Sequence, residues 1–166
     1  MMDEKIKKMM HEAFTGEAKA NLKLRVFSEK AEEEGYPQIA KLFKVIALSE
    51  SIHGKRALRY LKELKSTEEN LKESFESETM VAEHHYDEFI KHSTEVEDNA
   101  ALTIFTQTRD VEEVHAKLYK EAMNHMLEDV DTVYYICDVC GYVSDGVLPE
   151  VCPVCGVPKE KFTEFV

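Results

Sequence analysis

ESIH, residues 50–53, places a glutamate and a histidine three positions apart in the middle of a helical pattern of apolar residues. EEVH, residues 112–115, repeats this spacing within a second such pattern. Residues three positions apart share one face of an α-helix, so each stretch presents a carboxylate and an imidazole to the same point. Helices with this motif occur in bundles that hold two metal ions between them. The two stretches therefore predict a helical bundle with metal ligands on its inner face.

The apolar residues around these stretches recur at alternating steps of three and four, the spacing of an amphipathic helix. Four such segments cover residues 13–31, 39–64, 71–89 and 101–126. The first should end at Gly35-Tyr36-Pro37, and Thr67 is a candidate cap for the third. Helices of roughly 25 to 30 residues with these patterns predict an all-α, antiparallel four-helix bundle.

Each predicted helix carries one glutamate on its apolar stripe. These glutamates are Glu17, Glu50, Glu78 and Glu112. Burying one unpaired carboxylate costs on the order of several kcal/mol, so four of them at one level require cations. With His53 and His115 they match the ligand set of a di-iron or di-manganese bundle. Four carboxylates balance two Fe²⁺, and histidine favours iron or manganese over calcium or magnesium. Solvated glutamates on misassigned helix faces are the alternative interpretation.

The C-terminal stretch CDVCGYVSDGVLPEVCPVCG, residues 137–156, holds every cysteine of the chain. Two CxxC pairs can aim four thiolates at one point, as in tetrahedral zinc and iron sites. Geometry alone permits either metal. A redox-active di-metal site on the same chain favours iron, because such a site needs electrons delivered one at a time. The predicted ligands are Cys137, Cys140, Cys152 and Cys155.

Composition divides the chain and limits its partners. Three of the four prolines and three of the six glycines follow residue 140, which predicts a helical domain over 1–131 and a small metal-binding domain over 132–166. The 33 acidic and 21 basic residues give a formal charge of -12, and no basic run suits a nucleic acid. No stretch reads as a membrane span or a secretory signal, so we expect a cytoplasmic protein with reduced cysteines.

Over essentially its whole length the chain resembles the rubrerythrin family. The stretches AFTGEAKA, IALSESIHGK, SETMV and VEEVHAKLY resemble its ferritin-like di-iron domain, and CDVCGY and CPVCGVPKEKF resemble its rubredoxin-like domain. The resemblance implies a peroxidase that reduces hydrogen peroxide to water at a di-iron site. Its electrons would come from NAD(P)H, through rubredoxin or a reductase and then the Fe(Cys)4 centre. The resemblance also implies a homodimer in which the tail of one subunit lies near the di-iron site of the other, with helices swapped in some members.

The resemblance also assigns roles to single residues. It makes Glu50 and Glu112 bridging ligands and places Tyr86 near the site. Two departures from the family pattern stand out: Val81 replaces a usual glutamate, and Leu24 replaces a usual tyrosine. In the family, that glutamate takes over one iron from the first Glu-x-x-His histidine on oxidation. Valine cannot bind iron, so we predict that this chain keeps its histidine ligand in both oxidation states.

These departures leave other functions open. A ferritin-like ferroxidase or oxygen-reducing protein is the first alternative to the peroxidase. The second is a non-enzymatic metal-binding scaffold with a zinc-clipped tail. Zinc can enter either site, especially in recombinant protein, so the metal content separates these interpretations.

Overall fold

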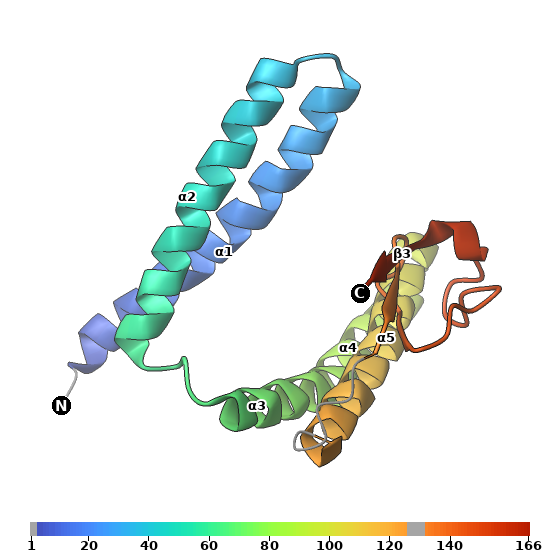
Figure 1. The fold of residues 1–166 in the computed structure, drawn as a ribbon. Helices are drawn as coiled ribbons and strands as arrows, with labels where there is room; N and C mark the ends of the chain where they lie inside the picture. The colour runs from blue at the N-terminus through green and yellow to red at the C-terminus, as the bar shows by residue number, and fades with distance from the viewer. Residues whose placement is uncertain (1–2, 126–131) are drawn as a thin grey trace. The chain divides into compact units, whose positions relative to one another are not determined.

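A computed structural model describes residues 3–125 and 132–166 of the chain (Figure 1). The described residues form two compact units, Met1–Lys65 and Ser66–Val166, and each is described by itself. The helical elements are α1 (Glu4–Glu33), α2 (Pro37–Leu61), α3 (Thr67–Met80), the π-helical turn η1 (Val81–His85), α4 (Tyr86–Glu95) and α5 (Asn99–His125). None of the helices in the described ranges is long and apolar enough to span a membrane.

The first unit is a hairpin of α1 and α2. Asp3 begins α1 by accepting a hydrogen bond from the backbone N–H of Ile6 at 3.0 Å. The helix ends as predicted, with Gly35 at a φ of 79° and Pro37 opening α2. Small residues let the two helices approach closely, and the buried hydroxyl of Ser28 donates to the carbonyl of Ala40 at 2.9 Å. The hairpin thus holds its two helices in a fixed register.

The second unit begins with a capping box. The hydroxyl of Ser66 accepts from the backbone N–H of Glu69, and the Glu69 carboxylate accepts from the N–H of Ser66. The expected cap, Thr67, is instead the first residue of α3. The prediction was wrong by one residue. Both side chains have a hydroxyl that can cap a helix, but the glutamate that completes the capping box, Glu69, stands three residues after Ser66.

The third predicted helix is not a continuous α-helix. A π-helical turn, Val81–His85, separates α3 from α4. A π-helical turn inserts an extra residue into the helix, and such turns often occur at functional sites. After the turn, Tyr86 and Phe89 pack with Phe105 of α5, at ring-centroid distances of 6.3 and 5.3 Å from it. This aromatic cluster joins α4 to α5.

The tail of the second unit is a small antiparallel sheet. It contains β1 (Tyr134–Cys137), β2 (Val143–Asp145) and β3 (Phe162–Phe165), and the strands lie in the order β2-β1-β3. A short 3-10 turn, η2 (Lys159–Lys161), precedes β3. Gly141 and Gly156 each follow the second cysteine of a CxxC pair with positive φ, of 81° and 74°. The glycines let each cysteine pair turn back on itself.

The overall organisation agrees with the predicted fold class: a helical part followed by a small four-cysteine module. The predicted domain boundary between 131 and 132 falls at the edge of residues 126–131, which lie outside the described residues, and it stays a prediction. Met126, the last residue of the fourth apolar stripe, lies outside them too.

Candidate metal centres

The hairpin carries three of the six predicted di-iron ligands, here named the hairpin triad: Glu17 of α1 with Glu50 and His53 of α2. His53 Nδ1 lies 3.2 Å from Glu50 Oε2 and 3.7 Å from Glu17 Oε1. A hydrogen bond between the two carboxyl groups raises the pKa of Glu17 and lowers the pKa of Glu50. Two carboxyl groups this close repel each other when both are ionised, and a cation bound beside them would relieve that repulsion.

The second unit carries the other three, here named the α5 triad: Glu78 of α3 with Glu112 and His115 of α5. His115 Nδ1 lies 3.1 Å from Glu112 Oε2. Burial raises the pKa of Glu78 to about 7, and a hydrogen bond to Glu112 and its negative charge act in the same direction. A cation here would displace a proton held at nearly neutral pH.

Each triad has the composition that a transition metal of intermediate softness requires. Two carboxylates supply negative charge and one imidazole supplies nitrogen, and the donor atoms of each triad lie within 4.8 Å of one another. The predicted burial is only partly realised: five of the six side chains are half-buried and His53 is exposed. The reason is that two helices alone form each triad in the single chain.

The structure also places the other residues that were singled out. Tyr86 is the first residue of α4, and burial, followed by the negative charge of Glu112, raises the pKa of its phenol. Val81 opens the π-helical turn and is half-buried. Leu24 is half-buried on α1.

One contact at the α5 triad had no signal in the sequence. His115 Nε2 lies 3.4 Å from the backbone carbonyl oxygen of Gly141, the residue after Cys140. A backbone carbonyl can only accept, so a hydrogen bond here requires the ring proton on Nε2, which leaves Nδ1, the nitrogen that faces Glu112, able to bind a metal. Such a bond fixes the orientation and tautomer of a ligating histidine. Any residue could supply the carbonyl, so no motif predicts the contact.

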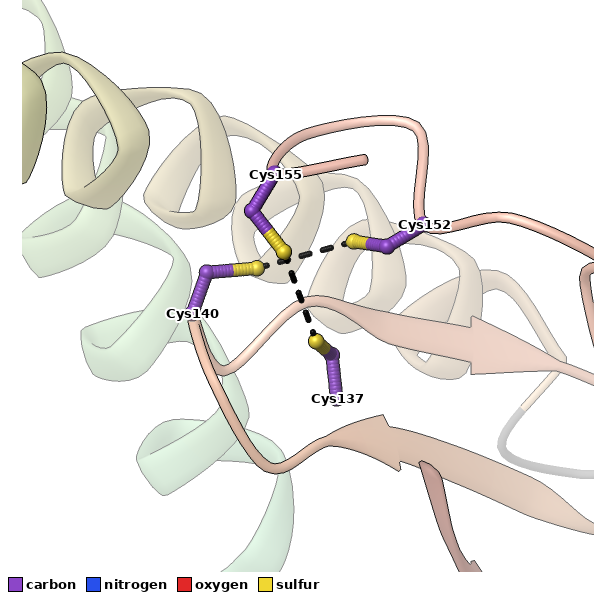
Figure 2. Close-up of side chains that lie close together, drawn as sticks. All are labelled: Cys137, Cys140, Cys152 and Cys155. Carbon is purple, nitrogen blue, oxygen red and sulfur yellow. Dashed lines mark hydrogen bonds between the residues drawn. The ribbon is translucent and has the colours of Figure 1, made fainter. Parts of the chain in front are cut away.

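The four cysteines of the tail converge on one point (Figure 2). Cys137 Sγ lies 3.7 Å from Cys155 Sγ, and Cys140 Sγ lies 3.6 Å from Cys152 Sγ. Metal–sulfur bonds of ~2.3 Å in a tetrahedron put sulfurs about 3.8 Å apart, so the spacing suits a bound metal and not disulfides. The prediction that these four residues come together is confirmed.

Local backbone structure prepares the thiols for a metal. Burial raises the pKa of Cys140. Burial also opposes ionisation of Cys152, but the backbone N–H groups of Cys155 and Val154 and the neighbouring thiols outweigh it and lower the pKa of Cys152. Thiolates near backbone N–H donors are the usual ligands of such knuckles. The donor set fits zinc or iron equally.

Comparisons with known proteins agree with this organisation. The family model described as Rubrerythrin matches residues 8–123, and the model described as the rubredoxin-like domain of rubrerythrin matches residues 135–163. Rubrerythrin-2 of Clostridium acetobutylicum is 32% identical over 94% of this chain and 94% of its own length. Nigerythrin of Nitratidesulfovibrio vulgaris is 31% identical over 92% of this chain and 83% of its own length.

Solved structures lead to the same conclusion. Nigerythrin in its fully reduced, all-ferrous state is similar with a TM-score of 0.59 and 30% identity, over 96% of this chain and 86% of that one. A structure of nigerythrin in a mixed-valence state is similar to the same extent. The two domain models together match most of the chain, and the relatives are similar to it over nearly its whole length. The chain belongs to the rubrerythrin family.

Proposed function

We propose that this protein is a peroxidase that reduces hydrogen peroxide to water at a di-iron carboxylate centre, with electrons entering through the four-cysteine tail. The observation that carries the proposal is the position of His115. Its ring lies between the Glu112 carboxylate and the backbone of the tail. A redox role for the tail explains why this contact exists, whereas a purely structural clip would not need it.

The two triads supply the ligands of the proposed centre. The hairpin triad would hold one iron and the α5 triad the other, and Glu50 and Glu112 would each serve both ions. Bound iron would supply the two electrons that convert hydrogen peroxide and two protons into two waters, and iron at the cysteines would deliver them one at a time. The carboxylates fit this use because their four negative charges balance two divalent cations.

The chain itself provides a continuous connection between the tail and the α5 triad. Cys140 is bonded covalently to Gly141, whose carbonyl accepts from His115 Nε2. The other ring nitrogen of His115 faces Glu112 at 3.1 Å. The peptide backbone and the Nε2 contact thus join a predicted metal ligand in the tail, Cys140, to a predicted ligand on α5, His115, which supports electron entry at this triad.

Tyr86 is proposed to act beside the α5 triad. Burial, together with the negative charges of Glu112 and Glu78, raises its pKa, so the phenol stays protonated at neutral pH. A neutral phenol donates a hydrogen bond to an oxygen atom held nearby. We propose that this hydrogen bond from Tyr86 orients an oxygen-containing substrate at the centre.

The proposed assembly is a homodimer in which the α1–α2 hairpins are exchanged between subunits. In the single chain, Phe27, Ile39 and Ile46 on the ligand-bearing stripes are 45%, 47% and 40% exposed. Apolar side chains on a stripe that also carries metal ligands need a covering surface. The proposed electron donor is rubredoxin or an NAD(P)H-dependent reductase, in the cytoplasm.

Stopped-flow absorption tests the reaction. Protein purified with its native metals, reduced anaerobically, is mixed in parallel with hydrogen peroxide and with oxygen. The peroxidase should be oxidised faster by peroxide than by oxygen at equal concentration. Faster oxidation by oxygen would instead support the ferroxidase or oxygen-reducing function, which the replacement of a glutamate by Val81 favours.

Metal analysis with an absorption spectrum tests the remaining alternative. Ferric iron at four thiolates is red, whereas a zinc-filled tail is colourless. A colourless protein with zinc at the cysteines after purification under native metal supply would contradict the proposed electron route and support a metal-binding scaffold.

A further inference from the structure

A groove between α1 and α2 is lined by two residues of the hairpin triad. It has a volume of about 240 Å³, and both Glu17 and Glu50 line it. Binding pockets for drug-sized ligands usually measure ~300–1,000 Å³, so this groove is somewhat smaller and suits small molecules. Because Glu17 and Glu50 line the groove, small molecules can reach these two side chains through it.

Gly54 keeps the floor of this groove free. A Cβ at this buried glycine would lie 3.7 Å from the ring of Phe14 and 3.8 Å from Cβ of Glu17. These are ordinary van der Waals distances, so alanine fits here without displacing its neighbours. Any side chain at position 54 would therefore occupy space next to the carboxylate-bearing side chain of Glu17.

The sides of the groove are partly polar. Asn21, Ser51 and Lys55 line it together with Ala18 and Leu58. The carboxamide of Asn21 donates to the backbone carbonyl of Ala47, which leaves its oxygen available as an acceptor. Hydroxyl, carboxamide and ammonium groups can hydrogen-bond hydrogen peroxide, which donates and accepts, but they offer nothing to apolar dioxygen.

We propose that this groove is the entrance by which small polar molecules, hydrogen peroxide among them, reach the metal centre, and that Gly54 sets its width. The identity of the oxidant rests on the proposed function, but the entrance itself does not. The inference adds a specificity element, because a polar entrance of this size favours peroxide over oxygen.

The test uses azide, a small anion that binds ferric di-iron centres with a new absorption band, on the full metal-loaded protein. Stopped-flow measurement gives its association rate for wild type, Gly54→Ala, Ser51→Leu and the matched control Gly16→Ala. Beyond its own helix, no described atom lies within 4 Å of a Cβ at Gly16. Both glycine substitutions gain similar helix propensity, so only the groove distinguishes them.

Narrowing the groove should slow azide without removing the metal. Gly54→Ala should lower the association rate several-fold and Ser51→Leu about tenfold, a barrier increase of ~1.4 kcal/mol, while Gly16→Ala matches wild type. Unchanged azide rates in both groove variants at wild-type iron content would overturn the proposal.

If either groove variant loses iron, a variant that changes only the charge of the groove tests whether the groove is the entrance. Lys55 is exposed, so Lys55→Glu leaves the packing intact. It should slow the azide anion at low salt, with the difference fading at high salt as charges are screened, and leave neutral peroxide unaffected. An azide rate in Lys55→Glu equal to wild type at low salt would contradict an entrance here.

These measurements also separate the entrance from the proposed function. Slower azide in the groove variants of a protein that does not react with peroxide would keep the entrance and reject the peroxidase. A rapid reaction with peroxide, together with unchanged azide association rates in every variant, would keep the peroxidase and reject the entrance.

Discussion

Val81 limits the ligands that the third predicted helix can offer, because a valine side chain cannot bind iron. It stands three residues after Glu78, at the start of the π-helical turn, where the family pattern has a glutamate. We predict that His53 therefore remains a ligand in both the reduced and the oxidised protein. Crystal structures of both states should keep His53 near the ~2.1 Å of a metal–imidazole bond. Val81→Glu should restore a movable ligand, and an iron that leaves His53 in oxidised wild type would refute the prediction.

Glu78 should make metal binding depend on pH. Its pKa in the metal-free protein is raised from 4.5 to about 7, so below pH 7 a binding cation must displace a proton from it. Cation affinity should rise with pH up to about 7 and then level off. The metal-free fold should lose stability between pH 4.5 and about 7, because the unfolded chain ionises first.

Calorimetric titration of Co²⁺ into protein with a zinc-filled tail measures this directly. Comparison of buffers with different ionisation enthalpies should show more protons released at pH 6 than at pH 8, because histidine ligands and Glu78 must all be deprotonated to bind the metal. Glu78→Gln should lower that difference by about one proton. Equal proton release at both pH values in wild type would show that Glu78 is ionised before the metal arrives.

At this scale the grouping of the candidate ligands was predictable and their surroundings were not. Glu17 and Glu50 stand out because charge interrupts an apolar stripe, and the structure brings them together with His53. The carbonyl of Gly141 could not be predicted, since every residue has one. Their joint role in one di-iron centre stays a proposal, because each triad belongs to a separate unit.

At the scale of single elements, the start of α3 offers a sharp comparison. Ser66 takes part in a capping box with Glu69, whereas Thr67 is the first helical residue. Ser66→Ala should lower the free energy of unfolding by about 1 kcal/mol, and Thr67→Ala should have much less effect. Urea midpoints of the two metal-loaded variants, compared with wild type, measure the difference. A larger loss of unfolding free energy in Thr67→Ala than in Ser66→Ala would show that Thr67 is the capping residue after all.

The π-helical turn marks the limit of periodicity as a guide to elements. Phe75, Glu78, Val81 and His85 are spaced as in an uninterrupted α-helix, so the pattern gave no sign of the turn. By contrast, the end of α1 was predictable because Gly35 and Pro37 have backbone preferences that stop a helix. Local chemistry decides helix ends, while the turn depends on packing against α5.

At the scale of the whole molecule, the proposed exchange of hairpins can be tested by complementation. One variant loses the hairpin triad through Glu50→Ala and His53→Ala, and the other loses the α5 triad through Glu112→Ala and His115→Ala. With exchanged hairpins, a mixed dimer has one centre with both triads intact and one with neither. Co-refolding the two variants should therefore restore a di-iron centre that neither variant forms alone.

A matched control shows whether co-refolding by itself restores iron binding. Two chains that carry the same hairpin-triad substitutions should recover nothing when refolded together. Failure of the mixed dimers to bind iron, at a confirmed heterodimer content, would mean that each chain builds its centre from its own hairpin.

The sequence predicted the modules better than their assembly. Four amphipathic stripes and two cysteine pairs specify helices and a metal knuckle, and these are present. The stripes cannot say whether α1 and α2 pack on helices of the same chain or of another, because both arrangements bury the same faces. The division at Lys65 and Ser66 therefore had no counterpart in the sequence pattern.

Anomalous diffraction at the iron edge, from crystals of protein purified with its native metals, tests the central claim most directly. The account predicts three iron peaks per chain: one at the four cysteines and two held by Glu17, Glu50, His53, Glu78, Glu112 and His115. A single iron peak at the four cysteines, with these glutamates pointing into solvent and no metal beside them, would contradict the account.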